Sequence, residues 1–278
     1  MTDIVIAGPH GPLGLRVYSA PEPAGPGLVW VHGGGFAAGD LDMPEADWVA
    51  RSFAARGITV VSVDYALAPL PADGAADAGQ TPREGVHYPI ASEEIEFAFR
   101  WAAESDLAAG PWALGGASAG GNLAAGAALR MSHGDGPVPA LAVLAYPTLH
   151  AVQSTPDAAL RAALDADPSA DRFFPDAVQG MYENYLGTSV DSADIYAVPG
   201  TASAAELVGF PPTIMINGSV DELRVSGEDF ARALRAADVE VDVSTEPDTT
   251  HGHLNRPEHD AAAASIERFA TRILDTSR

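Results

Sequence analysis

Continuous apolar runs alternate along the chain with stretches in which apolar residues recur at helical spacing. The continuous runs predict strands that are covered on both faces, at 28–32, 58–64, 141–146 and 213–218, and a further strand that starts at Trp112 and ends in a turn at Gly116-x-Ser118. The helical patterns fall between or after these strands, at 44–56, 93–104, 119–132, 223–237 and 257–274, and a further short strand is predicted at 240–244. Strands that alternate with helices predict a mainly parallel, twisted sheet with helices on both faces.

The alternation of predicted strands and helices is interrupted at the start of the chain and in its middle. Residues 3–7 and 13–20 flank a Gly/Pro segment and predict a hairpin. From 150 to 207 strand signals stop, and helical pieces alternate with Pro and Asp, which we interpret as a helical cap inserted into the core. The predicted core is therefore 1–149 together with 208–278.

One predicted helix allows a statement about its buried face. Ser92 is placed to cap a helix over 93–104, because a serine hydroxyl can accept a hydrogen bond from a free N–H of the first turn. Phe97 and Trp101 lie four residues apart, so we expect both rings to face the sheet.

Length and composition limit the class of protein. The chain has 278 residues, of which 47% are hydrophobic, which is enough for one α/β domain with an insertion. No apolar run approaches the 18 or more residues of a membrane span, and the N-terminus lacks the pattern of a secretory signal. We therefore expect a cytoplasmic protein.

Two residue types are absent, and the charge is one-sided. Without cysteine there is no thiolate nucleophile, and without lysine there is no Ser-x-x-Lys hydrolase, Schiff-base enzyme or P-loop ATPase. All 15 basic residues are arginine, and the formal net charge is −23. That charge disfavours nucleic acid and anionic membrane surfaces as partners.

Gly116-x-Ser118-x-Gly120 stands between a predicted strand and a predicted helix. A serine at the tip of a sharp strand-to-helix turn needs small neighbours two positions away. The N–H groups at the start of the helix then point at an oxyanion that forms near the serine. We predict Ser118 as a nucleophile; the alternative is that small residues only let the helix pack closely on the strand.

A serine nucleophile needs a base and an acid that orients it. Asp221 follows the strand at 213–218, and His251 follows the strand at 240–244, so both are expected at the carboxyl edge of the sheet near Ser118. The alternatives are Glu222 as the acid, an N-cap role for Asp221, and His253 as the base.

The loop after the strand at 28–32 has the sequence His32-Gly33-Gly34-Gly35-Phe36. We expect the backbone N–H groups of Gly33, Gly34 and Ala119 to form an oxyanion hole, although a plain Gly-rich turn remains the alternative. We expect His32 to shape the loop rather than act as an acid or base. Phe36 and the aromatic residues between 173 and 196 are candidate walls of the substrate pocket, and core packing explains them nearly as well.

Several of these segments match one family. The chain resembles the α/β-hydrolases of the hormone-sensitive-lipase-like carboxylesterase family in His32-Gly33-Gly34-Gly35-Phe36, Asp64-Tyr65-x-Leu67-Ala68-Pro69, Gly116-x-Ser118-Ala119-Gly120-Gly121, Asp221-x-Leu223 and His251-Gly252. The resemblance implies an α/β-hydrolase fold and a serine carboxylesterase that acts on short-chain esters. It implies no cofactor and no metal, the triad Ser118, Asp221 and His251, and a small-molecule ester as partner. A homodimer paired through an edge strand is compatible with it.

The chain also departs from the family pattern. The family often has a longer segment before its glycine motif, so we expect the cap to be reduced to 150–207. The loop at 71–85 is longer than usual, and we hypothesise that it lies beside the pocket. An amidase, a formamidase or a dehydratase on the same triad remains open, as does a non-catalytic receptor for small molecules.

Overall fold

An eight-stranded sheet forms the centre of the molecule, in the strand order β1-β2-β4-β3-β5-β6-β7-β8. The structure is a computed structural model, which describes residues 1–21, 25–72 and 81–277. The strands are β1 (Thr2–Gly8), β2 (Gly11–Tyr18), β3 (Gly27–Val31), β4 (Thr59–Asp64), β5 (Trp112–Ala117), β6 (Ala142–Ala145), β7 (Thr213–Val220) and β8 (Val241–Thr250). The β1–β2 and β2–β4 pairs are antiparallel, and the five remaining pairs are parallel.

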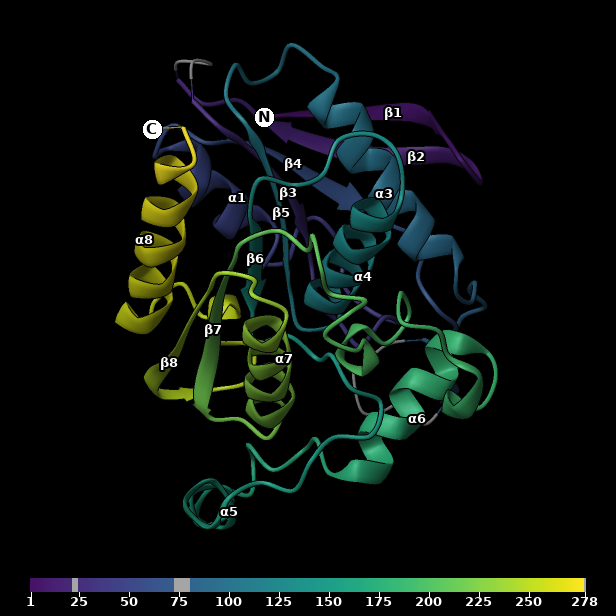
Figure 1. Ribbon diagram of the computed structural model, residues 1–278, viewed down its shortest axis with the longest axis vertical. Coiled ribbons are helices and arrows are strands. Elements are labelled where there is room, and N and C mark those ends of the chain that lie inside the picture. Colours follow the sequence, from purple (N-terminus) through teal and green to yellow (C-terminus); the bar gives the residue numbers. More distant parts are fainter. Residues whose placement is uncertain (22–24, 73–80, 278) are drawn as a thin grey trace.

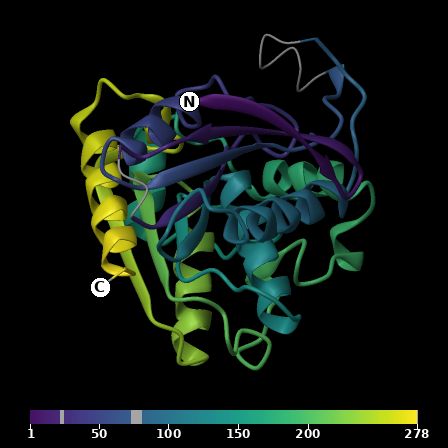
Figure 2. The same cartoon turned by 90° about the horizontal axis from the view of Figure 1, so that it is seen from above.

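Helices cover both faces of the sheet. They are α1 (Asp47–Ala54), α3 (Ile90–Ala103), α4 (Ala119–His133), α5 (Ala158–Ala166), α6 (Pro175–Leu186), α7 (Arg224–Ala236) and α8 (Asp260–Asp275), with short 3-10 turns η1 (Val190–Ser192), η2 (Pro199–Thr201) and η3 (His253–Asn255). Helices α1 and α8 lie on one face, and α3, α4 and α7 lie on the other (Figures 1 and 2). The mainly parallel α/β fold predicted from the sequence is confirmed.

The continuous apolar runs become buried because each side chain has a layer of helices above it. In β3, Val29 and Val31 join the core under α3 and α4, whereas Leu28 and Trp30 join the core under α1 and α8. A strand between two such layers has no polar face, which explains why its pattern is continuous rather than alternating.

The N-cap predicted for α3 is wrong, and its predicted aromatic pair is not its most buried face. The helix begins at Ile90, so Ser92 lies inside it and is buried rather than at its N-cap. Ile95 and Phe99 face the core, whereas the rings of Phe97 and Trp101 are only partly buried at its margin. Phe97 and Trp101 at i, i+4 spacing define one apolar stripe of the helix. A second stripe, which contains Ile95 and Phe99, is more buried.

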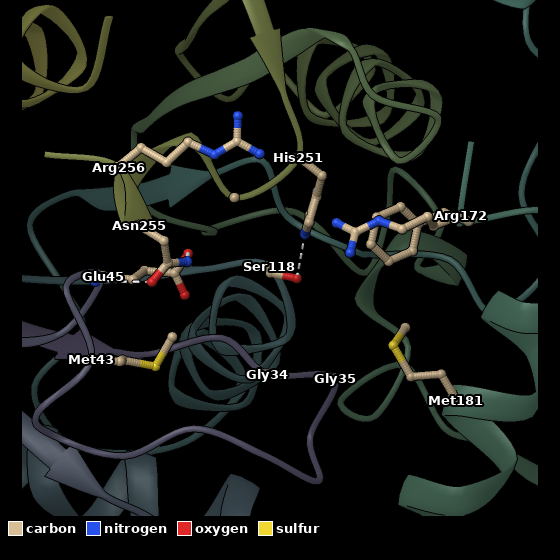
Figure 3. A pocket seen from close by; sticks show the side chains of 12 residues that line it. Gly34, Gly35, Met43, Glu45, Ser118, Arg172, Met181, His251, Asn255 and Arg256 are labelled. Carbon is tan, nitrogen blue, oxygen red and sulfur yellow. Dashed lines mark hydrogen bonds between the residues drawn. The ribbon is translucent and has the colours of Figure 1, made fainter. Parts of the chain in front are cut away.

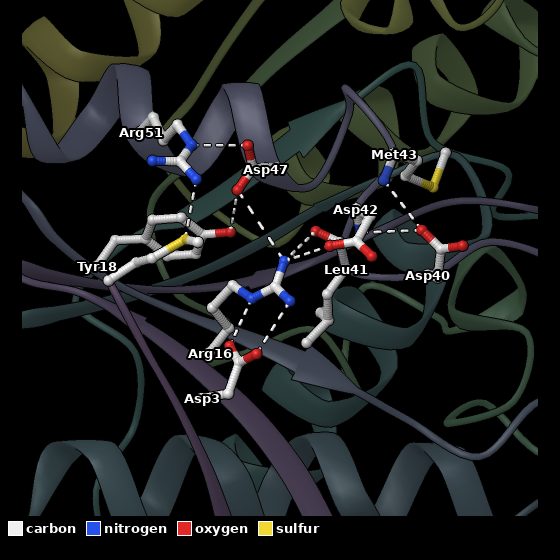
Figure 4. Close-up of polar contacts among 10 residues, drawn as sticks. Asp3, Arg16, Tyr18, Asp40, Leu41, Asp42, Met43, Asp47 and Arg51 are labelled. Carbon is white, nitrogen blue, oxygen red and sulfur yellow. Dashed lines mark hydrogen bonds and ion pairs between the residues drawn. The ribbon is translucent and has the colours of Figure 1, made fainter.

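The N-terminal hairpin holds the segment that leads into α1. Arg16 on β2 donates to both carboxylate oxygens of Asp3 at 2.6 and 3.1 Å, to Asp42 at 2.7 Å and to the carbonyl of Leu41 at 3.0 Å (Figure 4). The hydroxyl of Tyr18 donates to Asp47 at 2.8 Å. These bonds fix the segment before α1, which contributes two side chains to the cavity described below.

Helices α5 and α6 and the turns η1 and η2 lie between β6 and β7, within the range predicted as a reduced helical cap. This segment is tied to α4 by one buried side chain. The amide of Asn122 accepts from the hydroxyl of Tyr182 at 2.8 Å and donates to the carbonyl of Ala197 at 2.9 Å. Among the described residues, no helix combines the length and apolar character needed to cross a membrane.

Candidate active site

A cavity of about 340 Å³ opens at the carboxyl edge of the sheet, where β3, β5, β7 and β8 end. Ser118 and His251 line it together with Gly34 and Gly35 of the glycine loop and Met181 of the insertion (Figure 3), and Phe173 of the insertion lines it as well. Carboxyl ends of parallel strands are where α/β proteins collect functional side chains. The cavity therefore lies where the sequence predicts the site.

Ser118 stands at the tip of the turn from β5 into α4, with a backbone φ of 53°. Its side chain is 8% exposed and reaches the cavity. The flanking glycines are required by close packing, because a Cβ on Gly116 would lie 2.4 Å from the carbonyl of Gly120. A Cβ on Gly120 would lie 2.3 Å from the carbonyl oxygens of Val31 and His32. A non-glycine residue at positive φ is strained, and here the packing on both sides of Ser118 holds it.

Ser118, His251 and Asp221 form a continuous hydrogen-bonded chain. Nδ1 of His251 lies 2.7 Å from Oδ2 of Asp221, and Nε2 lies 2.9 Å from Oγ of Ser118. A carboxylate only accepts, so Nδ1 carries the proton and Nε2 accepts from the serine hydroxyl. The rings of Tyr146 and Phe173 pack edge-on against the imidazole at 5.0 and 4.5 Å between centroids, which fixes its plane.

Asp221 is not the N-cap of α7, because that position is Leu223, but its carboxylate also stabilises the turn before the helix. Its second oxygen, Oδ1, accepts from the backbone N–H of Leu223 at 3.0 Å, in the turn that leads into α7. Asp221 is fully buried, so both oxygens need partners, and each has one. One carboxylate thus orients the imidazole and holds the start of a helix.

The two competing residues point elsewhere. Nε2 of His253 lies 2.9 Å from the hydroxyl of Ser265, in the core under α8. Glu222 is buried beside Asp171, and burial raises the pKa of its carboxyl. Of the two acids and two histidines at these positions, Asp221 and His251 are the ones in contact with each other.

The structure changes one expected oxyanion donor. The N–H of Gly33 already donates to Oε1 of Glu45 at 2.8 Å, so it is not free for a substrate oxygen, and its prediction as a donor is wrong. Gly34 and Gly35 line the cavity, and Ala119 begins α4 beside Ser118. His32 is buried with its ring stacked on Tyr65 at 4.6 Å, in keeping with the expectation that it shapes the loop.

Phe36 does not line this cavity, which corrects its assignment to substrate binding. Its side chain is 1% exposed and stacks on Tyr185 at 4.1 Å between ring centroids. Among the aromatic residues between 173 and 196, Phe173 lines the cavity, whereas Tyr182 and Tyr185 are core residues. Residues 73–80 of the loop at 71–85, which we hypothesised to lie beside the pocket, are outside the described residues, and its described residues 71–72 and 81–85 do not line the cavity.

Glu45 was not singled out by the sequence, and it is the most connected acid of the site. Oε1 accepts from Gly33, while Oε2 accepts from the hydroxyl of Tyr146 and from the amide of Asn255, the latter at 3.1 Å. Its backbone carbonyl accepts from the indole of Trp30 at 2.8 Å. A buried glutamate cannot be distinguished from an exposed one in a single sequence, so no signal pointed to it.

Two arginines of the cavity were also missed. Arg172 comes from the segment between α5 and α6, and Arg256 follows η3. Both lie in Pro- and Asp-rich stretches whose sequence resembles any solvent-exposed loop. Only the folded chain brings them to the same cavity.

A mainly parallel sheet of this order, with a serine at a strand-to-helix turn and a histidine and an aspartate at the neighbouring strand ends, defines the α/β-hydrolase class. A family model described as an alpha/beta hydrolase fold matches residues 28–78 and 82–255.

Individual proteins give the same result. Esterase LipI of Mycobacterium tuberculosis is 34% identical over 264 residues, which cover 91% of this chain and 75% of that protein. Carboxylesterase NlhH of the same organism is 35% identical over 249 residues, which cover 87% and 71%. The solved structure of an esterase from Pyrobaculum calidifontis matches with a TM-score of 0.82 at 28% identity, covering 99% of this chain and 85% of that one. The chain belongs to the hormone-sensitive-lipase-like carboxylesterase family of α/β-hydrolases.

Proposed function

We propose that the chain is a serine carboxylesterase that hydrolyses short-chain carboxylic esters with Ser118, His251 and Asp221 as its catalytic triad. The observation that carries this proposal is the pair of hydrogen bonds that joins the three side chains, at 2.9 and 2.7 Å. Each residue has the partner that its role requires.

In the first half of the reaction, Oγ of Ser118 forms a bond to the ester carbonyl carbon while Nε2 of His251 takes the hydroxyl proton. Asp221, fully buried, stabilises the imidazolium. The bond between carbonyl carbon and alkoxide oxygen then breaks, and the alcohol leaves with that proton. In the second half, water attacks the acyl-enzyme with His251 as base, which releases the acid and restores Ser118.

The negative oxygen of each tetrahedral intermediate needs donors that are already in place. The backbone N–H groups of Gly34 and Ala119 are the proposed donors, with Gly35 next to them in the cavity wall. The engagement of Gly33 by Glu45 supports this choice, because it fixes the loop with the next two residues facing the cavity. Donors held in position before the reaction stabilise the oxyanion without reorganisation.

Ser118→Ala on a panel of p-nitrophenyl esters from C2 to C12 tests this proposal. The wild type should turn over the short esters fastest, because the cavity is small. The variant should lose at least about a thousandfold in kcat, with only the oxyanion donors and binding left to act. An S118A variant with wild-type turnover would refute the triad, and a wild type that binds esters without turnover would favour a receptor.

A further inference from the structure

Two arginine side chains that have no acidic partner among the described residues lie at the cavity that contains Ser118. The chain has 38 Asp and Glu residues against 15 basic ones, so most guanidinium groups have found a carboxylate. Within residues 1–21, 25–72 and 81–277, the guanidinium groups that form neither a hydrogen bond nor an ion pair are those of Arg172, Arg235 and Arg256. Two of these three line one cavity.

The two groups reach the cavity from different parts of the chain. Arg172 precedes α6, and its guanidinium carbon lies 5.6 Å from the ring centroid of Phe173, which itself packs against His251. Arg256 follows η3 and comes from the side of Asn255. Figure 3 shows the two guanidinium groups on either side of the His251 side chain. A ligand at Ser118 therefore occupies a cavity that two positively charged side chains line.

The carboxylates of Glu45 and Asp167 are already hydrogen-bonded within the protein. Glu45 is the acid of the cavity wall, and each of its oxygens accepts hydrogen bonds from within the protein. Asp167 lies in the field of Arg256 without an ion pair, and its carboxylate accepts from the hydroxyl and the N–H of Ser169 at 2.6 and 3.1 Å. The charge left free to meet a ligand is positive, although the molecule as a whole has a formal net charge of −23.

From this arrangement we infer that the preferred substrates are small esters that carry a free carboxylate, which Arg172 and Arg256 bind while Ser118 attacks the ester carbonyl. The inference rests on the proposed esterase function and adds the class of substrate. A guanidinium group presents a fork of N–H donors that matches a carboxylate. The cavity volume of about 340 Å³ suits a molecule in which carboxylate and ester are only a few bonds apart.

The carboxylate can belong to the acyl part or to the alcohol part of the ester. In the first case water cleaves a monoester of a dicarboxylic acid into the diacid and an alcohol. In the second case it cleaves an acylated hydroxy acid into a carboxylic acid and the free hydroxy acid. Both cases form and break the bonds described above for Ser118, and both place one fixed negative charge near the two guanidinium groups.

The test compares each charged ester with a neutral ester in which an isopropyl group replaces the carboxylate. Monoethyl glutarate is paired with ethyl 5-methylhexanoate, and acetoxyacetate is paired with isobutyl acetate. The wild type should favour the charged member of at least one pair by about tenfold or more in kcat/KM. The pair that shows the preference tells which part of the ester carries the carboxylate.

Arg172→Gln and Arg256→Gln should each lower this preference by roughly 3- to 10-fold. This decrease lies between the effect of losing an exposed ion pair and the effect of losing a charge-assisted bidentate hydrogen bond. Arg235→Gln is the matched control, because Arg235 on α7 is exposed and also lacks a partner, but it does not line the cavity. It should leave the preference unchanged.

Two results would overturn the inference. One is a wild type that hydrolyses the neutral member of both pairs as fast as the charged one. The other is a preference that R172Q and R256Q leave intact. In both cases Ser118-dependent hydrolysis of the neutral esters would show that the proposed esterase function survives, whereas hydrolysis of none of the four esters would remove both.

Discussion

Among single residues, Glu45 connects the glycine loop to the ring that packs on His251. One oxygen holds the N–H of Gly33, and the other holds the hydroxyl of Tyr146 and the amide of Asn255. The glycine loop and the ring that packs on His251 are thus fixed by the same carboxylate. Glu45 acts through these neighbours, so we regard it as a positioning residue.

We predict that Glu45→Ala lowers kcat by about 10- to 100-fold with little change in KM. The loop that contains the proposed oxyanion donors loses its anchor, and those donors act mainly on the transition state. The variant should also lose about 2–4 kcal/mol in the free energy of unfolding, because buried N–H and O–H groups are left unpaired. Steady-state kinetics well below the unfolding temperature measure the first effect, and urea unfolding measures the second.

Glu94→Ala separates the two effects. Glu94 is another buried acid, and its carboxylate accepts from the N–H of Ala66 at 2.7 Å, away from the cavity. Its removal should reduce stability by a similar mechanism and leave kcat near the wild-type value. If E45A and E94A reduced kcat equally, the effect of Glu45 would be one of stability alone. Partial rescue by Glu45→Gln, which keeps an acceptor for Gly33, would support positioning.

Among the elements, α8 is joined to the end of β8 through a buried polar chain. Ser265 donates to Glu246 at 2.8 Å, so its hydroxyl proton is used and Nε2 of His253 must be the donor in the 2.9 Å bond to Ser265. Arg268 on α8 pairs with the same carboxylate of Glu246. Burial, assisted by the nearby charge of His251, lowers the pKa of His253 from 6.5 to about 4.

This lowered pKa predicts a loss of stability in acid. Between pH 6.5 and 4 the unfolded chain binds a proton at His253 that the folded chain does not, so the free energy of unfolding falls as the pH falls through this window. The shift corresponds to roughly 3 kcal/mol over the whole window. His253→Gln removes the titrating group and should show a smaller loss between pH 7 and pH 4.5 than the wild type.

Urea unfolding at several pH values measures the difference, with His259→Gln as the control. His259 is exposed at the start of α8, and its variant should follow the wild-type profile. Comparing each variant with the wild type removes the contribution of the carboxylates, which titrate in the same window. A pH profile of H253Q parallel to that of the wild type would contradict a buried, neutral His253.

A helix, strand or turn was predictable from the sequence where one local sequence pattern is enough to determine it. A continuous apolar run is enough for β3, because a strand between two helical layers has no other pattern, and Gly116-x-Ser118-x-Gly120 is enough for the turn before α4. The face of α3 was not predictable in this way, because two apolar stripes compete and only the packing against the sheet chooses between them.

The residues of the candidate site that directly follow strands were predictable from the sequence, whereas the contacts between its loops were not. Asp221 and His251 follow strands, and parallel strands bring their carboxyl ends together, so their meeting with Ser118 follows from topology. The bond from Gly33 to Glu45, and the burial of Phe36, depend on how loops fold over one another. Loop contacts leave no periodicity in the sequence.

At the scale of the whole molecule, the dominant feature is the excess of acidic side chains. The formal net charge of −23 cannot be balanced by pairing, because 38 acids face 15 arginines. The pairs that do form are mostly at the surface, such as Arg16 with Asp3 and Arg56 with Glu267. Isolated surface pairs contribute little to stability, whereas like charges repel over about 10 Å at moderate salt.

We therefore predict that salt stabilises this protein. Raising NaCl from 10 to 300 mM near pH 7 should raise Tm by about 2–5 °C, because screening weakens repulsion between carboxylates more than it weakens the few surface pairs. The same series near the sequence pI of about 4.4 is the internal control, since the net charge is then close to zero and the slope of Tm against salt should nearly vanish. Differential scanning calorimetry measures both slopes. A Tm that falls with salt at pH 7 would mean that the arginine pairs outweigh the repulsion, and the acidic surface would then be neutral or favourable to the fold.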